Sequence, residues 1–266
     1  MSKNTPAYSD SERKKVRHAE FVMQRHLFKP SMAILELGGG SGYQASLAHD
    51  LGCNVLSIDI PEREPCDKED YPVQDYNGKS IPAPSASFDL VFSSNVLEHV
   101  SALPELLSEI HRVTKPAGMI LHWLPSPTWR FWHTMTHPMN VFRSISRKTT
   151  SRRNASSDAA HAPQGALNQH TKPALMQRLR WCLFGGFNPH GEFPNAFVEL
   201  HRFRRSKWKR IFEDAGFEII TIDSNRIFYT GYFFTRIPIR LRKVLSRCLG
   251  SSCNVFVMVP RQYGQN

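Results

Sequence analysis

Short apolar runs alternate with amphipathic segments along two stretches of the chain, from about residue 30 to residue 124 and from residue 208 to residue 260. Runs of this length, bounded by glycine, proline or charged residues, are typical of buried strands. When strands alternate with helices, the strands pair in parallel and helices cover both faces of the sheet. The pattern therefore predicts a doubly wound α/β fold. The predicted strands are 33–37, 54–60, 88–93, 119–124, 217–223 and 254–260.

The segments between these strands carry the signals of helices. Pro30 marks the end of the first helix, and Pro104 falls in the first turn of the third, where its missing amide is tolerated. Gly52 and Gly216 follow the second and fourth helices, as expected of C-terminal caps. A turn is predicted at 115–118. The predicted helices are 9–28, 43–51, 101–113 and 208–215.

Composition places the chain among globular proteins. Of its 266 residues, 41% are hydrophobic and 21% are charged. The first residues are polar, which argues against a signal peptide, and no uncharged apolar run is long enough to predict a membrane-spanning helix. The five cysteines are scattered without a CxxC pair, which favours a reducing compartment and no structural zinc. We therefore expect a cytoplasmic protein, with a peripheral position at a membrane as the alternative.

The positive charge is concentrated in the middle of the chain. The formal net charge is +11, yet residues 126–210 alone carry +12. Within it, residues 126–205 mix arginines with aromatic residues on both flanks of a polar, loop-like middle. Such a mixture suits a substrate lid, a membrane surface or an acidic partner, or a lid packed on the core with solvated charges. His190 and Glu192 are candidates for substrate contact, and a second basic aromatic stretch follows at 226–247.

Four glycines directly follow the first predicted strand, in the stretch ILELGGGSGYQ at residues 34–44. In an open α/β sheet, ligands lie beyond the carboxyl ends of the strands, so this loop marks a ligand site. The dinucleotide fingerprint would need glycine where Tyr43 stands, and the loop lacks the G-K-[ST] of a phosphate-binding loop. Because the loop also carries no basic residue, a phosphate-rich ligand is disfavoured.

Five motifs in order resemble the class I S-adenosylmethionine-dependent methyltransferases, in particular the methyltransferase type 11 group. The resemblance covers about residues 30–124 and, more faintly, 208–260. Ala117 replaces the usual first glycine of the last motif, and the segment between the two stretches is not explained. The motifs are ELGGGSG from Glu36, the acid Asp59 at the end of the second strand, Asp75 followed by IP and SFDLV, SSNVLEHV at 93–100, and RVTKPAG at 112–118.

The resemblance implies a mostly parallel seven-stranded, Rossmann-like sheet and S-adenosylmethionine as cofactor. It implies that Asp59 accepts hydrogen bonds from the ribose hydroxyls, and that Asp75 faces the adenine amine with Tyr76 beside the ring. Glu36 could instead cap its loop, and Asp75 could cap a turn. The cofactor-binding residues it implies are Glu36, Gly38, Gly39, Gly40, Gly42, Asp59, Ile60, Asp75, Tyr76 and Asn95.

The same resemblance divides the chain into four parts. A helical lead-in at 1–30 precedes a cofactor-binding α/β core at 31–125. The basic insertion or lid at 126–205 follows, and 206–266 completes the core. Acidic side chains around the loop suit a ligand with an ammonium group, ribose hydroxyls and an adenine amine.

The candidate catalytic residues are His99 and His122. A neutral imidazole, whose ordinary pKa is near 6.5, can take the proton of a substrate hydroxyl. In some relatives an E-x-x-E-H cluster binds a divalent metal. Here Asn95 replaces its first carboxylate, so we favour a role for Glu98 and His99 in fixing the loop and expect no metal.

Taken together, the residues favour methyl transfer from S-adenosylmethionine to a small molecule or glycan, in free or lipid-linked form, with peripheral membrane contact through the basic insertion. A nucleic-acid methyltransferase is one alternative, favoured by the basic segment. Against it, the chain has neither the N/D-P-P-Y/F motif nor a Pro-Cys nucleophile, and we expect no nucleic-acid partner. A binding protein that retains the cofactor site without turnover is the other alternative.

Overall fold

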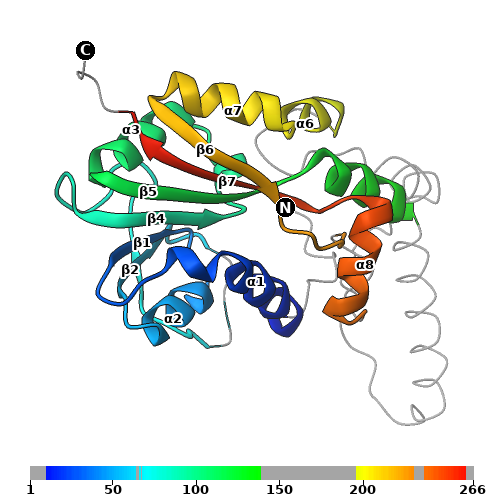
Figure 1. The fold of residues 1–266 in the computed structure, drawn as a ribbon, viewed down its shortest axis with the longest axis horizontal. Helices are drawn as coiled ribbons and strands as arrows, with labels where there is room; N and C mark the ends of the chain where they lie inside the picture. Colours follow the sequence, from blue (N-terminus) through cyan, green and yellow to red (C-terminus); the bar gives the residue numbers. More distant parts are fainter. Residues whose placement is uncertain (1–9, 64–65, 67, 139–195, 231–236, 262–266) are drawn as a thin grey trace, which may run out of the picture.

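A single seven-stranded sheet forms the centre of the computed structural model, which describes residues 10–63, 66, 68–138, 196–230 and 237–261 (Figure 1). The strand order is β3-β2-β1-β4-β5-β7-β6. Strands β1 to β5 are parallel, and β7 runs antiparallel between β5 and β6. The predicted doubly wound, mostly parallel sheet is confirmed. The strands are β1 (Ala33–Leu37), β2 (Asn54–Asp59), β3 (Val73–Asp75), β4 (Phe88–Ser94), β5 (Thr114–Pro125), β6 (Phe217–Ser224) and β7 (Cys253–Pro260).

Helices cover both faces of this sheet (Figure 1). Helices α1 (Asp10–Gln24) and α2 (Tyr43–Asp50) lie on one face, and α3 (Leu103–Val113) and α7 (Arg205–Asp214) lie on the other. Successive strand residues point to opposite faces, so Phe92 of β4 packs on the side of α1 and α2, whereas Val91 packs on the side of α3 and α7. Because both of their faces are buried, the central strands β1 and β4 are mostly apolar rather than alternating.

Most predicted elements agree with the structure. The strands predicted at 33–37, 54–60, 88–93, 217–223 and 254–260 and the helices at 43–51, 101–113 and 208–215 are all present, with ends shifted by up to three residues. The turn predicted at 115–118 is wrong, because β5 already begins at Thr114. Its pairing with β4 shifts register between Phe88 and Leu90, which accommodates the Lys-Pro-Ala-Gly sequence within the strand.

Several elements were not predicted. Strand β3 has three residues, of which only Val73 is buried, so it has no periodic pattern to detect. The 3-10 helices η1 (Arg25–Leu27) and η2 (Leu97–His99) are equally short. Residues 127–138 are helical, and α6 (Ala196–Arg202) and α8 (Ile239–Leu249) lie in stretches rich in arginine and aromatic residues. Residues 139–195, which include His190 and Glu192, lie outside the described residues.

The two described ends of the basic insertion meet in a buried ion pair. Arg130 Nε lies 2.5 Å from Glu199 Oε2, and the two side chains are 1% and 0% exposed. Arg130 belongs to the helix at 127–138, and Glu199 belongs to α6. Because neither group can return to water without breaking the packing around it, the pair fixes the two helices to each other.

Candidate cofactor site

The carboxyl ends of four parallel strands meet at one edge of the sheet and bring the predicted acidic residues together. Leu37 of β1 pairs with Ile58 of β2 and with Ser93 of β4, and Asp59 pairs with Asp75 of β3. This edge is where open α/β sheets bind ligands. The residues that end or directly follow the strands there are Glu36, Asp59, Asp75 and Asn95.

The glycine loop between β1 and α2 is packed by the protein on most sides and open at Gly40. A Cβ atom added at Gly38, Gly39 or Gly42 would collide with Val96, Ser57 or Tyr71, respectively. At Gly40, whose φ is +58°, an added Cβ would meet no atom of the described chain within 4 Å. The open side of the loop at Gly40 therefore leaves room for a ligand next to the backbone.

Asp59 holds this loop in place. Its Oδ2 accepts a hydrogen bond of 2.8 Å from the Gly40 amide, and its Oδ1 accepts one of 2.8 Å from the Ile60 amide. A carboxylate has four lone-pair positions, so two remain for hydroxyl donors of a ligand. Ile60 is 40% exposed beside it. The carboxylate at the end of β2 is thus oriented before any ligand binds.

Glu36 is a buried acid of this edge with a raised pKa. It is 4% exposed, and its Oε2 accepts a hydrogen bond of 2.6 Å from Ser57 Oγ. Burial raises the pKa of Glu36 to about 8, against the opposing effects of the Ser57 hydrogen bond and the positive charge of Arg17. A cationic group bound at this edge would lower the pKa of Glu36, and the ionised carboxylate would in turn stabilise the bound cation.

Arg17 was missed by the sequence reading. This residue of α1 donates to both Ser94 Oγ and the Ser94 carbonyl oxygen at the end of β4, the latter at 3.1 Å. Its guanidinium also lies 3.2 Å from Glu20, which is fully buried and accepts a hydrogen bond of 2.8 Å from Asn225. The positive charge of Arg17 lowers the pKa of Glu36 against the effect of burial. Helix α1 therefore contributes the cation that balances the buried acids of the site.

The outer part of the edge is formed by β3 and the loop before it. Asp75 is 57% exposed in its side chain and forms an ion pair with Arg63, which also lies 3.1 Å from Glu69. The Tyr76 amide donates to the Asp59 carbonyl oxygen at 2.9 Å, and burial raises the pKa of the Tyr76 hydroxyl. Asp75 is thus accessible at the edge, although Arg63 occupies one of its carboxylate oxygens.

A second loop braces the glycine loop from outside. Ser41 Oγ donates to Asp70 at 2.8 Å, and the Asp70 amide donates back to the Ser41 carbonyl oxygen at 2.7 Å. Lys14 of α1 lies 2.7 Å from the same carboxylate. Asp70 therefore ties α1, the glycine loop and the segment before β3 together, a link that no sequence motif signals.

The loop after β4 carries Asn95, Glu98 and His99. The Asn95 amide donates to the Trp123 carbonyl oxygen at 2.8 Å, with a φ of +54°. Glu98 is 1% exposed, its Oε2 has no hydrogen-bond partner among the described residues, and burial raises its pKa to about 8. His99 Nε2 lies 3.8 Å from Glu98 Oε1, and the imidazole is 43% exposed. His99 is thus the accessible imidazole of this loop.

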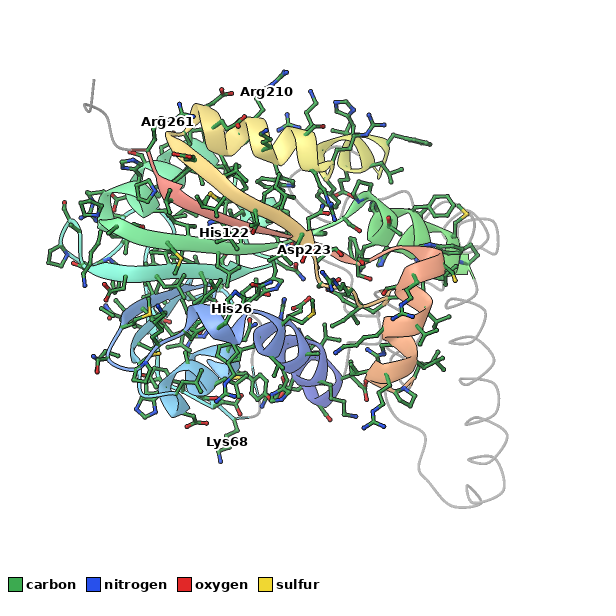
Figure 2. All side chains as sticks on the ribbon, in the orientation of Figure 1. His26, Lys68, His122, Arg210, Asp223 and Arg261 are labelled. Atoms are coloured by element: carbon green, nitrogen blue, oxygen red, sulfur yellow. The ribbon has the colours of Figure 1, made fainter. Side chains whose placement is uncertain are left out.

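His122 of β5 pairs with Ser93, at the level of this edge, but its side chain is buried between the sheet and α7 (Figure 2). It is fully buried, its Nδ1 is 2.8 Å from Ser93 Oγ, and its ring stacks on Phe212 of α7 at 5.7 Å. Burial lowers its pKa to about 3, so the imidazole is neutral. His122 is therefore a buried imidazole, whereas that of His99 is accessible.

The chemistry of these groups fits S-adenosylmethionine. The open backbone at Gly40 leaves room for the cofactor, and the carboxylate of Asp59 can accept hydrogen bonds from its ribose hydroxyls. The exposed carboxylate of Asp75 suits the adenine amine, and Glu36 suits a cationic group. Within the described part of the chain, no three His, Cys, Asp or Glu side chains lie close enough together to hold a metal ion.

Comparison with known proteins agrees with this geometry. A family model described as "Methyltransferase domain" matches residues 12–222. The chain belongs to this family. The match includes the glycine loop, Asp59, the loop after β4 and α7, so the sites described above lie within it.

Individual relatives match shorter parts of the chain. The malonyl-[acyl-carrier protein] O-methyltransferase of Serratia marcescens is 33% identical over 98 residues, which is 35% of this chain and 38% of that protein. A probable S-adenosylmethionine-dependent methyltransferase of Mycolicibacterium smegmatis is 33% identical over 115 residues, or 41% of this chain and 45% of that protein. These curated relatives therefore match over less than half of their own length.

The fold also matches solved structures over nearly the whole chain. An S-adenosylmethionine-dependent methyltransferase of Mesorhizobium loti superposes with a TM-score of 0.51 at 18% identity, covering 91% of this chain and 97% of that chain. At this identity the likeness shows the fold alone. The family is that of S-adenosylmethionine-dependent methyltransferases, and the expected cofactor agrees with it.

Proposed function

We propose that this chain transfers a methyl group from S-adenosylmethionine to a hydroxyl group of a small molecule or glycan, in free or lipid-linked form. The observation that carries the proposal is the open side of the glycine loop at Gly40, bordered by the Asp59 carboxylate. When bound there, the cofactor supplies a methyl group from its sulfonium centre. The chain itself has to bind, orient and shield the reactants.

In this proposal the sheet edge divides the recognition of the cofactor among separate groups. Asp59 and Ile60 take the ribose, Asp75 and Tyr76 take the adenine, and Glu36 with the glycine loop takes the amino-acid end. Asn95 lines the side nearest β4. The positions of these groups at the ends of β1 to β4, and the charges that they carry, support this division.

His99 is the candidate for the group that takes the hydroxyl proton. Its imidazole is accessible, and it lies next to the Glu98 carboxyl group, whose Oε1 is 3.8 Å away. Above its pKa of about 8, an ionised Glu98 would stabilise the imidazolium that forms when His99 accepts a proton. His99 would take the proton that the acceptor hydroxyl loses when its oxygen is methylated, and loss of the methyl group would convert the sulfonium of the bound cofactor into a neutral thioether.

The acceptor class rests on weaker support than the cofactor. The relative from Serratia marcescens is named for an acceptor on an acyl-carrier protein, which is a carrier-bound acceptor. The basic insertion that would contact such an acceptor lies largely outside the described residues, as does half of the net charge of residues 126–210 that would favour a nucleic acid. Hydroxyl acceptors, free and lipid-linked, are therefore the first class to test.

The proposal is tested by following methyl transfer from radiolabelled S-adenosylmethionine to a panel of sugars, lipid-linked sugars and an RNA oligomer. We expect transfer to a hydroxyl acceptor and none to RNA. In His99→Gln, kcat should fall by about a hundredfold or more, as for loss of a general base, while cofactor affinity stays unchanged. Glu105→Gln, on an exposed glutamate of α3, is the matched control. Transfer to RNA alone would overturn the acceptor class, and an unchanged kcat in His99→Gln would overturn the role of His99.

A further inference from the structure

Helix α8 exposes two parallel stripes of different character. Arg240, Lys243 and Arg247 are spaced i, i+3 and i+7, so they lie along one line of the helix, and all three are exposed. Leu241 and Val244 lie along the adjoining line and are 48% and 54% exposed. Large apolar side chains exposed to this degree, directly beside cations, need a reason.

The opposite face of α8 anchors it to the protein. Arg242 Nε donates to the Ile237 carbonyl oxygen at 2.7 Å, and its guanidinium lies 2.9 Å from Glu12 of α1. Ser246 Oγ donates to the Arg226 carbonyl oxygen at 2.9 Å. Because this buried face fixes the rotation of the helix, the two stripes are held outward.

The outward cations have no counter-charge in the described chain. Neither Arg240, Lys243 nor Arg247 forms an ion pair with any residue in the ranges that the structure describes, and α8 itself contains four basic residues and no acidic one. Other cations of the described surface do form ion pairs, for example Lys14 with Asp70 and Arg112 with Glu109. The stripe is therefore available to an anionic partner.

A neighbouring helix adds apolar side chains at the same end of the molecule (Figure 1). Trp132 Nε1 donates to the Leu249 carbonyl oxygen at the end of α8, at 3.0 Å, which joins the helix at 127–138 to α8. Phe131 and Met135, one turn apart on that helix, are 46% and 47% exposed, and the Phe131 ring contacts that of Trp132 at 5.3 Å. Exposed apolar residues thus occur on both of these joined helices.

We propose that the outward face of α8 docks on a membrane surface that contains anionic lipids. Cations would meet the lipid phosphates, while Leu241 and Val244 would enter the boundary between headgroups and acyl chains, as in helices that lie in the plane of a membrane. A polyanion such as RNA would use the cations, but it offers no place for the apolar stripe. The combination of the two stripes is what favours a lipid surface.

The residues of this proposed contact differ from those of the cofactor site. The stripes lie on α8, whereas the glycine loop and Asp59 lie at the carboxyl ends of β1 and β2. The membrane contact therefore does not depend on the acceptor proposed above, and either proposal can fail alone.

The test is sedimentation of the full chain with vesicles of phosphatidylcholine alone and of phosphatidylcholine mixed with phosphatidylglycerol. One variant removes the cations (Arg240→Gln, Lys243→Gln and Arg247→Gln), and a second removes the apolar stripe (Leu241→Ser and Val244→Ser). The matched control removes the same charge from α7, with Lys207→Gln, Lys209→Gln and Arg210→Gln. Arg210 points outward from α7 at a distance from α8 (Figure 2). Thermal unfolding and S-adenosylmethionine binding check that each variant is folded.

We expect the wild type and the α7 control to bind the anionic vesicles and to bind phosphatidylcholine much more weakly. Each cation near such a surface is worth about fivefold in affinity, so the cation variant should bind about a hundredfold more weakly. The apolar variant should also lose affinity. Absence of binding by the wild type would overturn the proposal, and so would equal loss in the α7 control. Binding to RNA that needs the cations but not Leu241 and Val244 would assign the face to a polyanion instead.

Discussion

The backbone amide of Gly40 donates a hydrogen bond of 2.8 Å to the carboxylate of Asp59, and this contact joins the loop after β1 to the end of β2. The loop is thereby held in one conformation with its open side at Gly40. Two strands that are neighbours in the sheet thus supply both the space for a ligand and the acid beside it. The predictions below follow from this arrangement and from the buried charges around it.

Gly40→Ala is expected to lower S-adenosylmethionine affinity at least tenfold. Alanine in the left-handed region costs about 1 kcal/mol of stability, and its methyl group would fill the space left for the ligand. Gly52→Ala is the matched control, because Gly52 also has a positive φ, +84°, and an added Cβ would meet only Pro30 at an ordinary 3.5 Å. Calorimetric titration and thermal unfolding of both variants give the two quantities.

The two variants should lose similar stability, while only Gly40→Ala should lose binding. If Gly52→Ala weakened binding equally, the effect at Gly40 would come from the stability of the fold. Full affinity in Gly40→Ala would mean that the ligand does not approach the loop at this position.

Stability should fall as pH rises from about 4.5 to about 8, because Glu36 and Glu98 have pKa values of about 8 in the folded protein and ordinary values in the unfolded chain. Over this window the folded state holds protons that the unfolded state has released. Glu36→Gln and Glu98→Gln should therefore be more stable than the wild type at pH 9 and show less pH dependence. Glu105→Gln, on an exposed carboxylate, should behave as the wild type in unfolding curves measured across this range.

S-adenosylmethionine binding at pH 7 should release a proton from Glu36. A cationic ligand beside this carboxyl group favours its ionised form, which is the minority form below a pKa of about 8. Titrations in phosphate and in Tris, whose ionisation enthalpies differ, should give different heats for the wild type. Glu36→Gln should reduce that difference. Equal heats in both buffers for the wild type would show that no titrating group near pH 7 is coupled to the cofactor.

Removing one partner of the buried pair between Arg130 and Glu199 should destabilise the protein strongly. Arg130→Met leaves a carboxylate without its cation in a site that is 0% exposed, which costs about 3–5 kcal/mol. The double variant Arg130→Met with Glu199→Leu should recover much of the loss. Lys209→Met breaks an exposed pair with Glu213 and should cost less than about 1 kcal/mol. Denaturant unfolding compares the variants, and equal losses at both pairs would contradict the account.

The sheet and the acids at its edge could be predicted because both leave local signals. Buried parallel strands produce continuous apolar runs, and Glu36 and Asp59 lie at the ends of two such runs. Arg17 could not be predicted, because α1 carries several cations and only its packing decides which of them reaches Ser94. Similarly, the part of β5 that holds His122 was predicted as a strand at 119–124, but its start at Thr114 was not. The stacking of the His122 imidazole on Phe212 of α7 could not be predicted, because it depends on tertiary packing.

The short strand β3 and the basic helix α8 also could not be predicted from the local sequence pattern. Strand β3 exists through its pairing with β2, where Asp75 aligns with Asp59. Helix α8 lies in a stretch rich in basic and aromatic residues. Its two exposed stripes could not be predicted, because they depend on Arg242 and Ser246 facing the protein interior. Tertiary contacts thus determine both features.

The most direct test of the cofactor site is calorimetric titration of S-adenosylmethionine into the wild type and into Asp59→Ala, with thermal unfolding to confirm that both are folded. Asp59→Ala removes the acceptor for the Gly40 amide and the proposed acceptor for the ribose hydroxyls. We predict micromolar binding by the wild type, reduced at least about a hundredfold in Asp59→Ala, since hydrogen bonds to charged groups are worth about 1.5–3 kcal/mol each. Absence of binding by the folded wild type, or unchanged affinity in Asp59→Ala, would contradict the proposed site.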